Sequence, residues 1–282
     1  MKQSSFTEAD TEALFDDRER DKRFRSFWDP EGSLHWGYFE NLAEARASDF
    51  VPACKRWDEY MLEHSGITAE SRVLEVACGN GNAAIWLAQQ TGCEVVGVDL
   101  SGNYIENALR KASNFPSLRV SFHKESATNL PFENGAFTHA WSQGALYHIH
   151  ELEKALAEVH RVLGEGGIFL FDDLVTPVEE VSETTRKYVY ERLLFEPTFS
   201  PEVYAEKLRS LGFTVLQLKD LSEHLKKSYE LVSELARDRY PDLSLAFEKT
   251  QEAIAARELG WCFYLCEKVK SSKVSDLLSG KR

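Results

Sequence analysis

The sequence predicts an α/β protein with a doubly wound, mostly parallel sheet and helices on both faces. Three observations predict it. Short β-branched runs alternate with helical patterns between residues 71 and 175, glycines stand at several junctions of these patterns, and 43% of the 282 residues are hydrophobic. Such alternation is typical of βαβ units, and the apolar content is sufficient for a core.

Each element of this central region follows from a short pattern. Apolar β-branched runs predict strands, and amphipathic stretches with apolar residues three or four apart predict helices. The expected strands are 72–77, 93–100, 118–126, 137–144 and 168–175. The expected helices are 81–92, 102–115 and 150–167, the last of which is closed by glycines.

The last third continues the alternation with a longer connection. Strands joined through a helical insert need not be parallel, so a hairpin-like pair at the sheet edge fits the pattern. Cys262 and Cys266 lie four residues apart and should face the same side of the last strand as core thiols. The expected elements are a helix over 200–213, a strand over 214–222, the insert over about 224–259 and a last strand over 261–269.

The N-terminal section is expected to form a helical lid. Residues 1–24 are charged and predict a solvated helix or no fixed structure, with 19–23 as a solvated face. Residues 27–39 gather aromatic side chains around a Pro-Glu-Gly turn and should pack as a lid or as irregular core. Pro52, in the helical stretch that follows, predicts a kink or two helices. The expected organisation is a lid over 1–70, a central domain over 71–270 and a tail over 271–282.

Composition excludes several classes of partner. The formal net charge of −13 disfavours nucleic acids and anionic membranes, which require clustered Lys and Arg. The five cysteines form no CxxC pair, so neither a disulfide framework nor a metal site is expected. No leader pattern and no apolar run of about 20 residues is present. We therefore expect a cytoplasmic monomer or homodimer that acts on a small molecule.

A glycine turn after the first strand is the main functional signal. Gly79-Asn80-Gly81-Asn82-Ala83-Ala84 fits the pattern G-x-G-x-x-A, and Asp99 lies 20 residues after Gly79 at the end of the next strand. This spacing fits a dinucleotide-binding fingerprint. Glu75, just before the turn, favours another ligand, because a carboxylate suits an ammonium group and repels a pyrophosphate.

Four motifs together resemble the class I methyltransferases that use S-adenosylmethionine. They are EVACGNG (75–81), VVGVDLS (95–101), NLPF followed by GAF (129–137) and RVL followed by GG (161–167). The resemblance implies a Rossmann-like sheet and S-adenosylmethionine as cofactor, with S-adenosylhomocysteine as product. The family's first glycine is Ala77 here, and the acid that often precedes its adenine-contacting alanine is Ser126.

The resemblance also implies which residues hold the cofactor. Glu75 would face its amino group, and Asp99 would accept hydrogen bonds from both ribose hydroxyls. Leu100 and Ala127 would enclose the adenine, and glycines without a Cβ would let the methionine part approach the turn. The expected cofactor-binding residues are Glu75, Ala77, Cys78, Gly79, Asn80, Gly81, Asp99, Leu100, Ser126, Ala127, Trp141, Ser142, Gln143, Trp36 and Tyr38.

Two further segments and the helical insert resemble the sarcosine/dimethylglycine N-methyltransferase branch. The segments are WSQGALYH (141–148) and the aromatic LHWGYF (34–39), although the acid that often follows Trp-Ser-Gln is Gly144 here. The resemblance implies methyl transfer to a small molecule, first of all an amine such as glycine, sarcosine or dimethylglycine. His148 and Tyr147 are the expected catalytic residues, with His148 accepting a proton. Trp28, Trp36, Tyr38, Tyr147 and His148 would surround the reacting methyl group.

Charged residues near this region leave the acceptor open. An acceptor with a carboxylate would need an arginine, and Arg25, Arg186 and Arg192 are the candidates. Asp172 and Asp173 could meet a cationic acceptor or lie exposed at a helix start. Three alternative functions also remain: an O- or C-methyltransferase of a secondary-metabolite pathway, an NAD(P)-dependent reductase, and a cofactor-binding protein without turnover.

Overall fold

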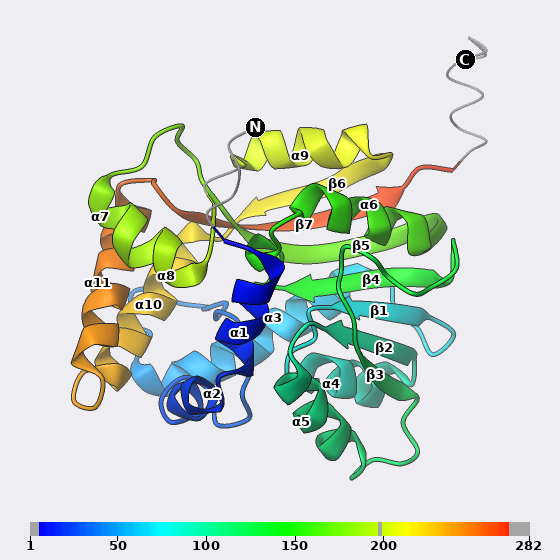
Figure 1. Ribbon diagram of the computed structural model, residues 1–282, viewed down its shortest axis with the longest axis horizontal. Coiled ribbons are helices and arrows are strands. Elements are labelled where there is room, and N and C mark those ends of the chain that lie inside the picture. Colours follow the sequence, from blue (N-terminus) through cyan, green and yellow to red (C-terminus); the bar gives the residue numbers. More distant parts are fainter. Residues whose placement is uncertain (1–5, 197–198, 271–282) are drawn as a thin grey trace.

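The computed structural model describes residues 6–196 and 199–270, and its centre is a seven-stranded sheet (Figure 1). The strand order is β3-β2-β1-β4-β5-β7-β6. The first five strands in this order are parallel, and β7 runs antiparallel between β5 and β6. The predicted doubly wound sheet and its antiparallel edge pair are confirmed. The strands are β1 (Arg72–Val76), β2 (Glu94–Asp99), β3 (Val120–Lys124), β4 (Phe137–Gln143), β5 (Leu163–Val175), β6 (Phe213–Asp220) and β7 (Gly260–Lys268).

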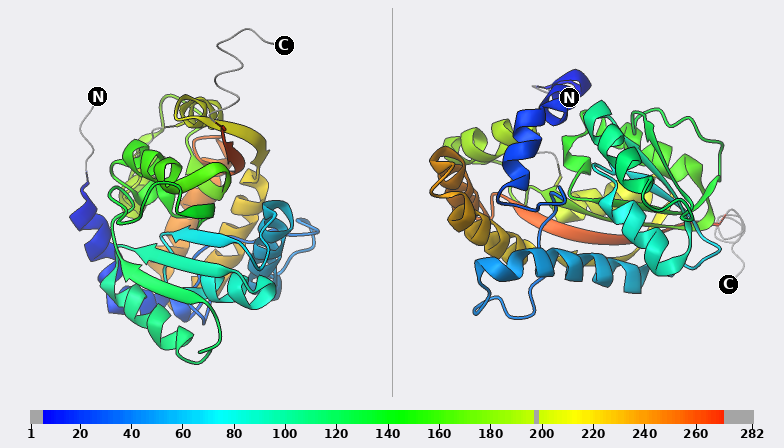
Figure 2. Two further views of the ribbon diagram at one scale, coloured as in Figure 1. Left: turned by 90° about the vertical axis from the view of Figure 1, so that its right-hand side faces the viewer. Right: turned by 90° about the horizontal axis from the view of Figure 1, so that it is seen from below.

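Helices cover both faces of the sheet, as the views in Figures 1 and 2 show. Successive strand residues point to opposite faces, so Val73 joins a hydrophobic cluster with α3, α4, α10 and α11, whereas Leu74 joins one with α6 and α9. Cys262 and Cys266 both belong to the second cluster, as predicted. The helices are α3 (Phe50–Ser65), α4 (Asn82–Thr91), α5 (Gly102–Ala112), α6 (Leu152–Val162), α9 (Pro201–Ser210), α10 (Ser222–Ala236) and α11 (Pro241–Ala255).

Two expected elements end or bend differently in the structure. The helix expected to reach residue 167 ends at Val162, because Leu163 pairs with Phe137 and begins β5 with the glycines that follow. Pro52 causes no kink and does not split the helix. It is the third residue of α3, where the N–H that proline lacks would have no partner within the helix.

The N-terminal section forms two helices, α1 (Glu8–Asp16) and α2 (Arg18–Arg25). Thr7 and Asp10 form a capping box at the start of α1. Asp17 separates the helices and accepts hydrogen bonds from the backbone N–H groups of Glu19 and Arg20. Local capping side chains therefore define where both helices begin. Phe24, near the end of α2, is buried.

The insert and the segment before α9 complete the wall on one side of the molecule. The insert is the pair α10 and α11. The buried hydroxyls of Ser233 and Ser244 share a hydrogen bond, and the Ser244 hydroxyl also contacts the backbone carbonyl of Ser233 at hydrogen-bond distance. Between β5 and α9 lie three short elements that the sequence did not predict: α7 (Glu183–Thr185), the π-helical η3 (Arg186–Tyr190) and α8 (Glu191–Leu193). The expected tail at 271–282 lies outside the described residues. Within the described ranges, no helix has the length and apolarity needed to cross a bilayer.

Gly81, in the turn before α4, should tolerate a side chain less well than Gly66. Gly81 has φ +72°, and a Cβ there would lie 2.7 Å from the Phe122 ring and 2.8 Å from Ala108. Gly66 has φ +70°, and a Cβ there would meet no atom within 4 Å. Gly66→Ala should therefore lose about 1–2 kcal/mol from backbone strain alone, and Gly81→Ala a further ~1–3 kcal/mol from overlap. Urea unfolding followed by circular dichroism measures both, and equal losses would contradict the packing role of Gly81.

Candidate functional site

A cavity opens at the carboxyl ends of β1, β2 and β4, the edge at which ligands bind in open parallel sheets. The loops after these strands form its floor, and α1, α2 and residues 32–36 form its roof. Figure 1 shows α1 and α2 on the side toward which the arrows of these strands point. Residues of α8 and α10 add a side wall. The cavity therefore lies between the predicted central domain and the predicted lid.

The turn after β1 forms the narrow end of the cavity floor. Ala77 and Gly79 both adopt positive φ angles, 56° and 52°. Ala77 thus keeps the left-handed backbone that a glycine would adopt most easily. Ala77, Cys78, Gly79 and Asn80 line the cavity, as predicted. The turn is compact because the N–H of Gly81 donates to the carbonyl of Cys78 over 2.9 Å.

Asp99 fixes this turn from the end of β2. One carboxylate oxygen accepts the N–H of Gly79 over 2.8 Å, and the other accepts the N–H of Ser101 over 2.8 Å. Burial raises the pKa of Asp99 to about 6, although these two N–H donors favour the ionised form. Asp99 and Leu100 both line the cavity, so the structure brings them beside the turn as predicted.

Several residues that line the cavity have a buried polar atom without a partner in the described part of the chain. Among these atoms are Oε2 of Glu75 and Oδ1 of Asn80, whose side chains are 5% and 3% exposed. Burial raises the pKa of Glu75 well above its ordinary value, and the nearby Asp58 carboxylate adds to this rise. An unpartnered buried acceptor is costly. A cation or N–H donor at this end of the cavity would satisfy both atoms.

Ser126 and Glu8 form a second pair of polar residues in the cavity lining. Ser126 and Ala127 line the cavity, as does Glu8 of α1. The hydroxyl of Ser126 donates to Oε2 of Glu8 over 2.7 Å. Glu8 therefore places a carboxylate beside the position where the resembling family often has an acid, although it comes from a distant part of the sequence.

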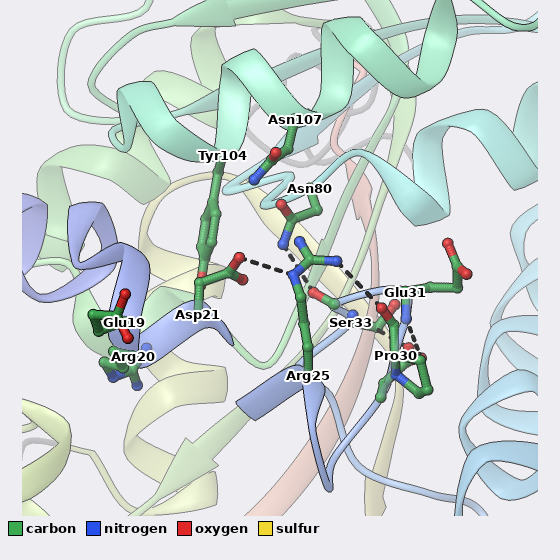
Figure 3. A network of polar contacts seen from close by, with 12 residues as sticks. Glu19, Arg20, Asp21, Arg25, Pro30, Glu31, Ser33, Asn80, Tyr104 and Asn107 are labelled. Atoms are coloured by element: carbon green, nitrogen blue, oxygen red, sulfur yellow. Dashed lines mark hydrogen bonds and ion pairs between the residues drawn. The ribbon is translucent and has the colours of Figure 1, made fainter. Parts of the chain in front are cut away.

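The roof is fastened to the turn by polar contacts (Figure 3). The amide of Asn80 donates to the carbonyl of Gly32 over 3.0 Å. Arg25 forms an ion pair with Asp21 over 2.8 Å and donates to the carbonyl of Pro30 over 3.4 Å, and Figure 3 shows it between these two residues. Arg25 is thus occupied in holding the roof.

Aromatic side chains line the wider part of the cavity. The rings of Trp36 and Tyr147 are stacked with centroids 6.3 Å apart, and the Tyr147 and His148 ring centroids are 4.0 Å apart. Phe24, Trp28 and other aromatic residues line the same space. Burial, with smaller contributions from Arg20 and Arg192, lowers the pKa of His148 to about 3. Its imidazole is therefore neutral, and its buried Nδ1 has no partner among the described residues.

Two predicted residues of β4 do not reach the cavity. Trp141 is fully buried in the core, and its indole N–H donates to Gln143 over 3.0 Å. Ser142 points to the opposite face and donates its hydroxyl to the carbonyl of Val76 over 2.9 Å. Gln143 does line the cavity. Trp141 and Ser142, both expected to contact the cofactor, thus do not line the cavity, because the strand buries both against its neighbours.

Gly81 and Tyr38 also lie outside the cavity lining, contrary to prediction. Gly81 faces Phe122 and lets α4 approach β3 closely. Tyr38 packs against His224, with centroids 4.5 Å apart, and its hydroxyl accepts a hydrogen bond from Lys219 over 2.9 Å. Tyr38 is therefore held on the far side of the loop that carries Trp36.

The two acids that end β5 are buried rather than exposed or facing a ligand. Asp172 accepts the indole N–H groups of Trp57 and Trp261 over 2.8 and 2.7 Å. Asp173 accepts the N–H of Tyr147 and the hydroxyl of Tyr204, both over 3.0 Å. Both carboxylates position neighbouring elements, and neither lines the cavity.

The predicted solvated face at 19–23 requires correction, because Arg20 lines the cavity. Sequence reasoning also missed Glu8, Thr11, Phe15 and Phe24 as lining residues. Thr11 and Phe15 lie four residues apart, as do Arg20 and Phe24, so each pair shares one face of its helix. This four-residue spacing could have indicated that these side chains share a face toward the cavity. The many charged residues around them indicated a solvent-exposed helix instead.

The comparisons with known proteins agree with this geometry. Residues 74–171 match a family described as a methyltransferase domain. The chain is 29% identical to the glycine/sarcosine/dimethylglycine N-methyltransferase of Actinopolyspora halophila, over 75% of this chain and 37% of that protein, so it spans little more than a third of that relative. It is 25% identical to the O-methyltransferase resE of Aspergillus sclerotiorum, over 84% of this chain and 90% of that protein.

A solved structure shows the same fold. The geranyl diphosphate C-methyltransferase from Streptomyces coelicolor A3(2), in complex with Mg²⁺, geranyl diphosphate and S-adenosyl-L-homocysteine, superimposes with a TM-score of 0.76. The match covers 94% of this chain and 100% of that one, at 15% identity. The chain therefore contains a methyltransferase domain over residues 74–171 and has the fold of a solved methyltransferase. The reductase alternative has no support.

Proposed function

We propose that this methyltransferase transfers a methyl group from S-adenosylmethionine to the nitrogen of a small-molecule amine. The observation that carries the proposal is the aromatic part of the cavity. There His148, whose Nδ1 has no partner among the described residues, packs against Tyr147, and Tyr147 stacks on Trp36. Aromatic faces stabilise a sulfonium and a cationic amine product. The N-methyltransferase relative supports the same acceptor class.

The narrow end of the cavity fits the amino-acid part of the cofactor. Glu75 and Asn80 would bind its ammonium group, because each presents a buried oxygen that lacks a partner among the described residues. Asp99 would accept hydrogen bonds from the ribose hydroxyls. Leu100 and Ala127 would enclose the adenine, and Glu8 would accept from its exocyclic amino group beside Ser126. A pyrophosphate would meet three carboxylates along this path, which disfavours a dinucleotide.

The residues of the wider part would position the acceptor. Bound S-adenosylmethionine supplies an activated methyl group, so in-line placement of the acceptor provides most of the rate. The neutral imidazole of His148 would accept a hydrogen bond from the N–H of a primary or secondary amine and direct the nitrogen lone pair toward the methyl group. With a pKa of about 3, His148 would orient the amine and not store its proton, so the acceptor would react as the free amine and the ammonium product would release its proton to water. The N–H of Tyr147 is held by Asp173, which fixes this loop.

Oxygen methylation is the second candidate, favoured by the O-methyltransferase relative that the chain matches over most of its length. A methylation screen read by mass spectrometry decides between the two. The panel contains glycine, sarcosine, dimethylglycine, phosphoethanolamine, a phenol and a hydroxybenzoate, each with S-adenosylmethionine. We expect mass gain on an amine. Methylation of the oxygen compounds alone would contradict the amine proposal.

Asp99→Ala should weaken the affinity for S-adenosylhomocysteine by about 1.5–3 kcal/mol, the range for hydrogen bonds to a charged group. Asp220→Ala is the matched control, because Asp220 also ends a strand and accepts a backbone N–H, from Ser222 over 2.8 Å, but lies outside the cavity. Titration calorimetry measures both. An unchanged dissociation constant in a folded Asp99→Ala variant would contradict the cofactor role.

The affinity for S-adenosylhomocysteine should fall as the pH is lowered through 6. Asp99 has a raised pKa of about 6, so below that pH it is protonated and loses its role as acceptor. A ligand that requires the ionised form binds about tenfold more weakly at pH 5 than at pH 7.5. Asp99→Asn should remove this part of the pH dependence. A wild-type affinity that is constant between pH 5 and 7.5 would contradict the assignment.

His148→Ala should lower kcat by about 10²-fold, the size of effect expected when the acceptor atom is displaced by about 1 Å from its reactive position. Its dissociation constant for S-adenosylhomocysteine should change less than threefold, because the imidazole lies away from Glu75 and Asp99. Steady-state kinetics on the acceptor found in the screen, with calorimetry in parallel, separates the two effects. Equal losses in both measurements would assign His148 a purely structural role.

A further inference from the structure

Two arginines face the aromatic part of the cavity without an acidic partner. Arg20 comes from α2 in the roof, and Arg192 comes from α8 in the side wall. Among the described residues, no carboxylate lies within salt-bridge distance of either guanidinium. In a chain with a net charge of −13, two enclosed arginines that lack a counter-charge are unusual. Such an arrangement is stabilised when an anion binds between them.

The guanidinium of Arg20 packs on aromatic faces and donates no hydrogen bond to a residue within 6–196 or 199–270. Its guanidinium carbon lies 4.9 Å from the centroid of Phe15 and 4.7 Å from that of Phe24. Cation–π contacts of this kind orient the planar group and leave its N–H edge available. Figure 3 shows Arg20 on α2, apart from the network that occupies Arg25. Arg20 is therefore positioned for a ligand, whereas Arg25 holds the roof.

Contacts with η3 and α11 hold the side chain of Arg192 in position. Its Nε donates to the carbonyl of Tyr188 over 2.9 Å, and its Nη2 lies 3.4 Å from the hydroxyl of Thr250. The guanidinium also lies over the ring of Phe247, 5.4 Å from its centroid. These contacts use two of its nitrogens, and Nη1 donates no hydrogen bond to the described part of the chain. A planar anion could take the remaining donors.

Both arginines line the same cavity as Tyr147 and His148. Both also lower the pKa of His148, and Arg192 contributes to the lowered pKa of Arg20. Like charges that share an enclosed space repel each other. An anion between them removes that repulsion.

We propose that Arg20 and Arg192 bind an anionic group, a carboxylate or a phosphate, on the methyl acceptor. This inference rests on the proposed function and narrows it to acceptors with an anion at one end and the reacting atom at the other. It also assigns part of the acceptor specificity to α2, which lies outside the matched domain at 74–171. Because Arg20 belongs to the roof, the acceptor's anion would join the roof to the side wall.

The experiment compares Arg20→Met with the matched control Arg23→Met. Arg23 lies on the same helix and also covers an aromatic ring, that of Tyr240 at 5.6 Å, but it does not line the cavity. Calorimetry on the S-adenosylhomocysteine complex uses dimethylglycine and phosphoethanolamine as probes, with dimethylglycinamide and ethanolamine as counterparts that lack the anionic group. The two anionic arms distinguish a carboxylate from a phosphate acceptor.

We expect the wild-type complex to bind one of the two probes and to bind the counterpart without the anionic group at least tenfold more weakly. Arg20→Met should weaken binding of that probe roughly 10- to 100-fold, Arg20→Lys should weaken it less, and Arg23→Met should change it less than twofold. The affinity for S-adenosylhomocysteine should stay within twofold of wild type in all three variants. With a turned-over acceptor, the loss should appear in KM more than in kcat.

The outcomes separate this inference from the proposed function. Equal binding of a probe and its counterpart without the anionic group, binding of neither probe, or an unchanged affinity in Arg20→Met would overturn the anion site. If the screen finds an amine without an anionic group as acceptor, the amine proposal stands and the anion site fails. If it finds a hydroxybenzoate whose KM rises in Arg20→Met, the anion site stands and the amine proposal fails.

Discussion

The buried carboxylate of Asp99 is the interaction on which the rest of the site depends. It accepts the N–H of Gly79 from the turn after β1 and the N–H of Ser101 from the start of α5. The hydroxyl of Ser101 then donates to Asp16 at the end of α1 over 2.6 Å. One buried acid thus connects two neighbouring strands and, through a single serine, the roof. Its burial is costly, as its raised pKa shows.

The cavity separates acidic from basic side chains, and the net charge of the chain does not reveal this separation. Carboxylates of Glu8, Glu75 and Asp99 lie along the turn, whereas Arg20 and Arg192 face the aromatic part. A ligand pair in which a cationic methyl donor meets an anionic acceptor suits this separation. Because both charges are enclosed by apolar walls, each acts more strongly than it would in water. Net charge therefore says little about such a site, although it disfavours polyanionic partners.

Buried acids also join elements that are far apart in the sequence. Asp172 receives indole N–H groups from α3 and from β7, and Asp173 fixes the loop that carries Tyr147. Their place at the end of a strand predicts contact with solvent or with a ligand. The surroundings of Asp172 depend instead on two tryptophans, 115 and 89 residues away in the chain, which no local pattern predicts.

The sequence by itself determined the alternation of strands and helices, the turn at residues 77–80 and the place of Asp99. These features are local, since each follows from apolar periodicity or from the backbone freedom of glycine. Only the tertiary structure decided that Arg20 and Glu8 enter the cavity, and that Trp141 and Tyr38 do not. The physical reason is that a side chain's surroundings depend on how helices pack across the sheet edge, and α1 and α2 carry charges that by pattern alone belong in water.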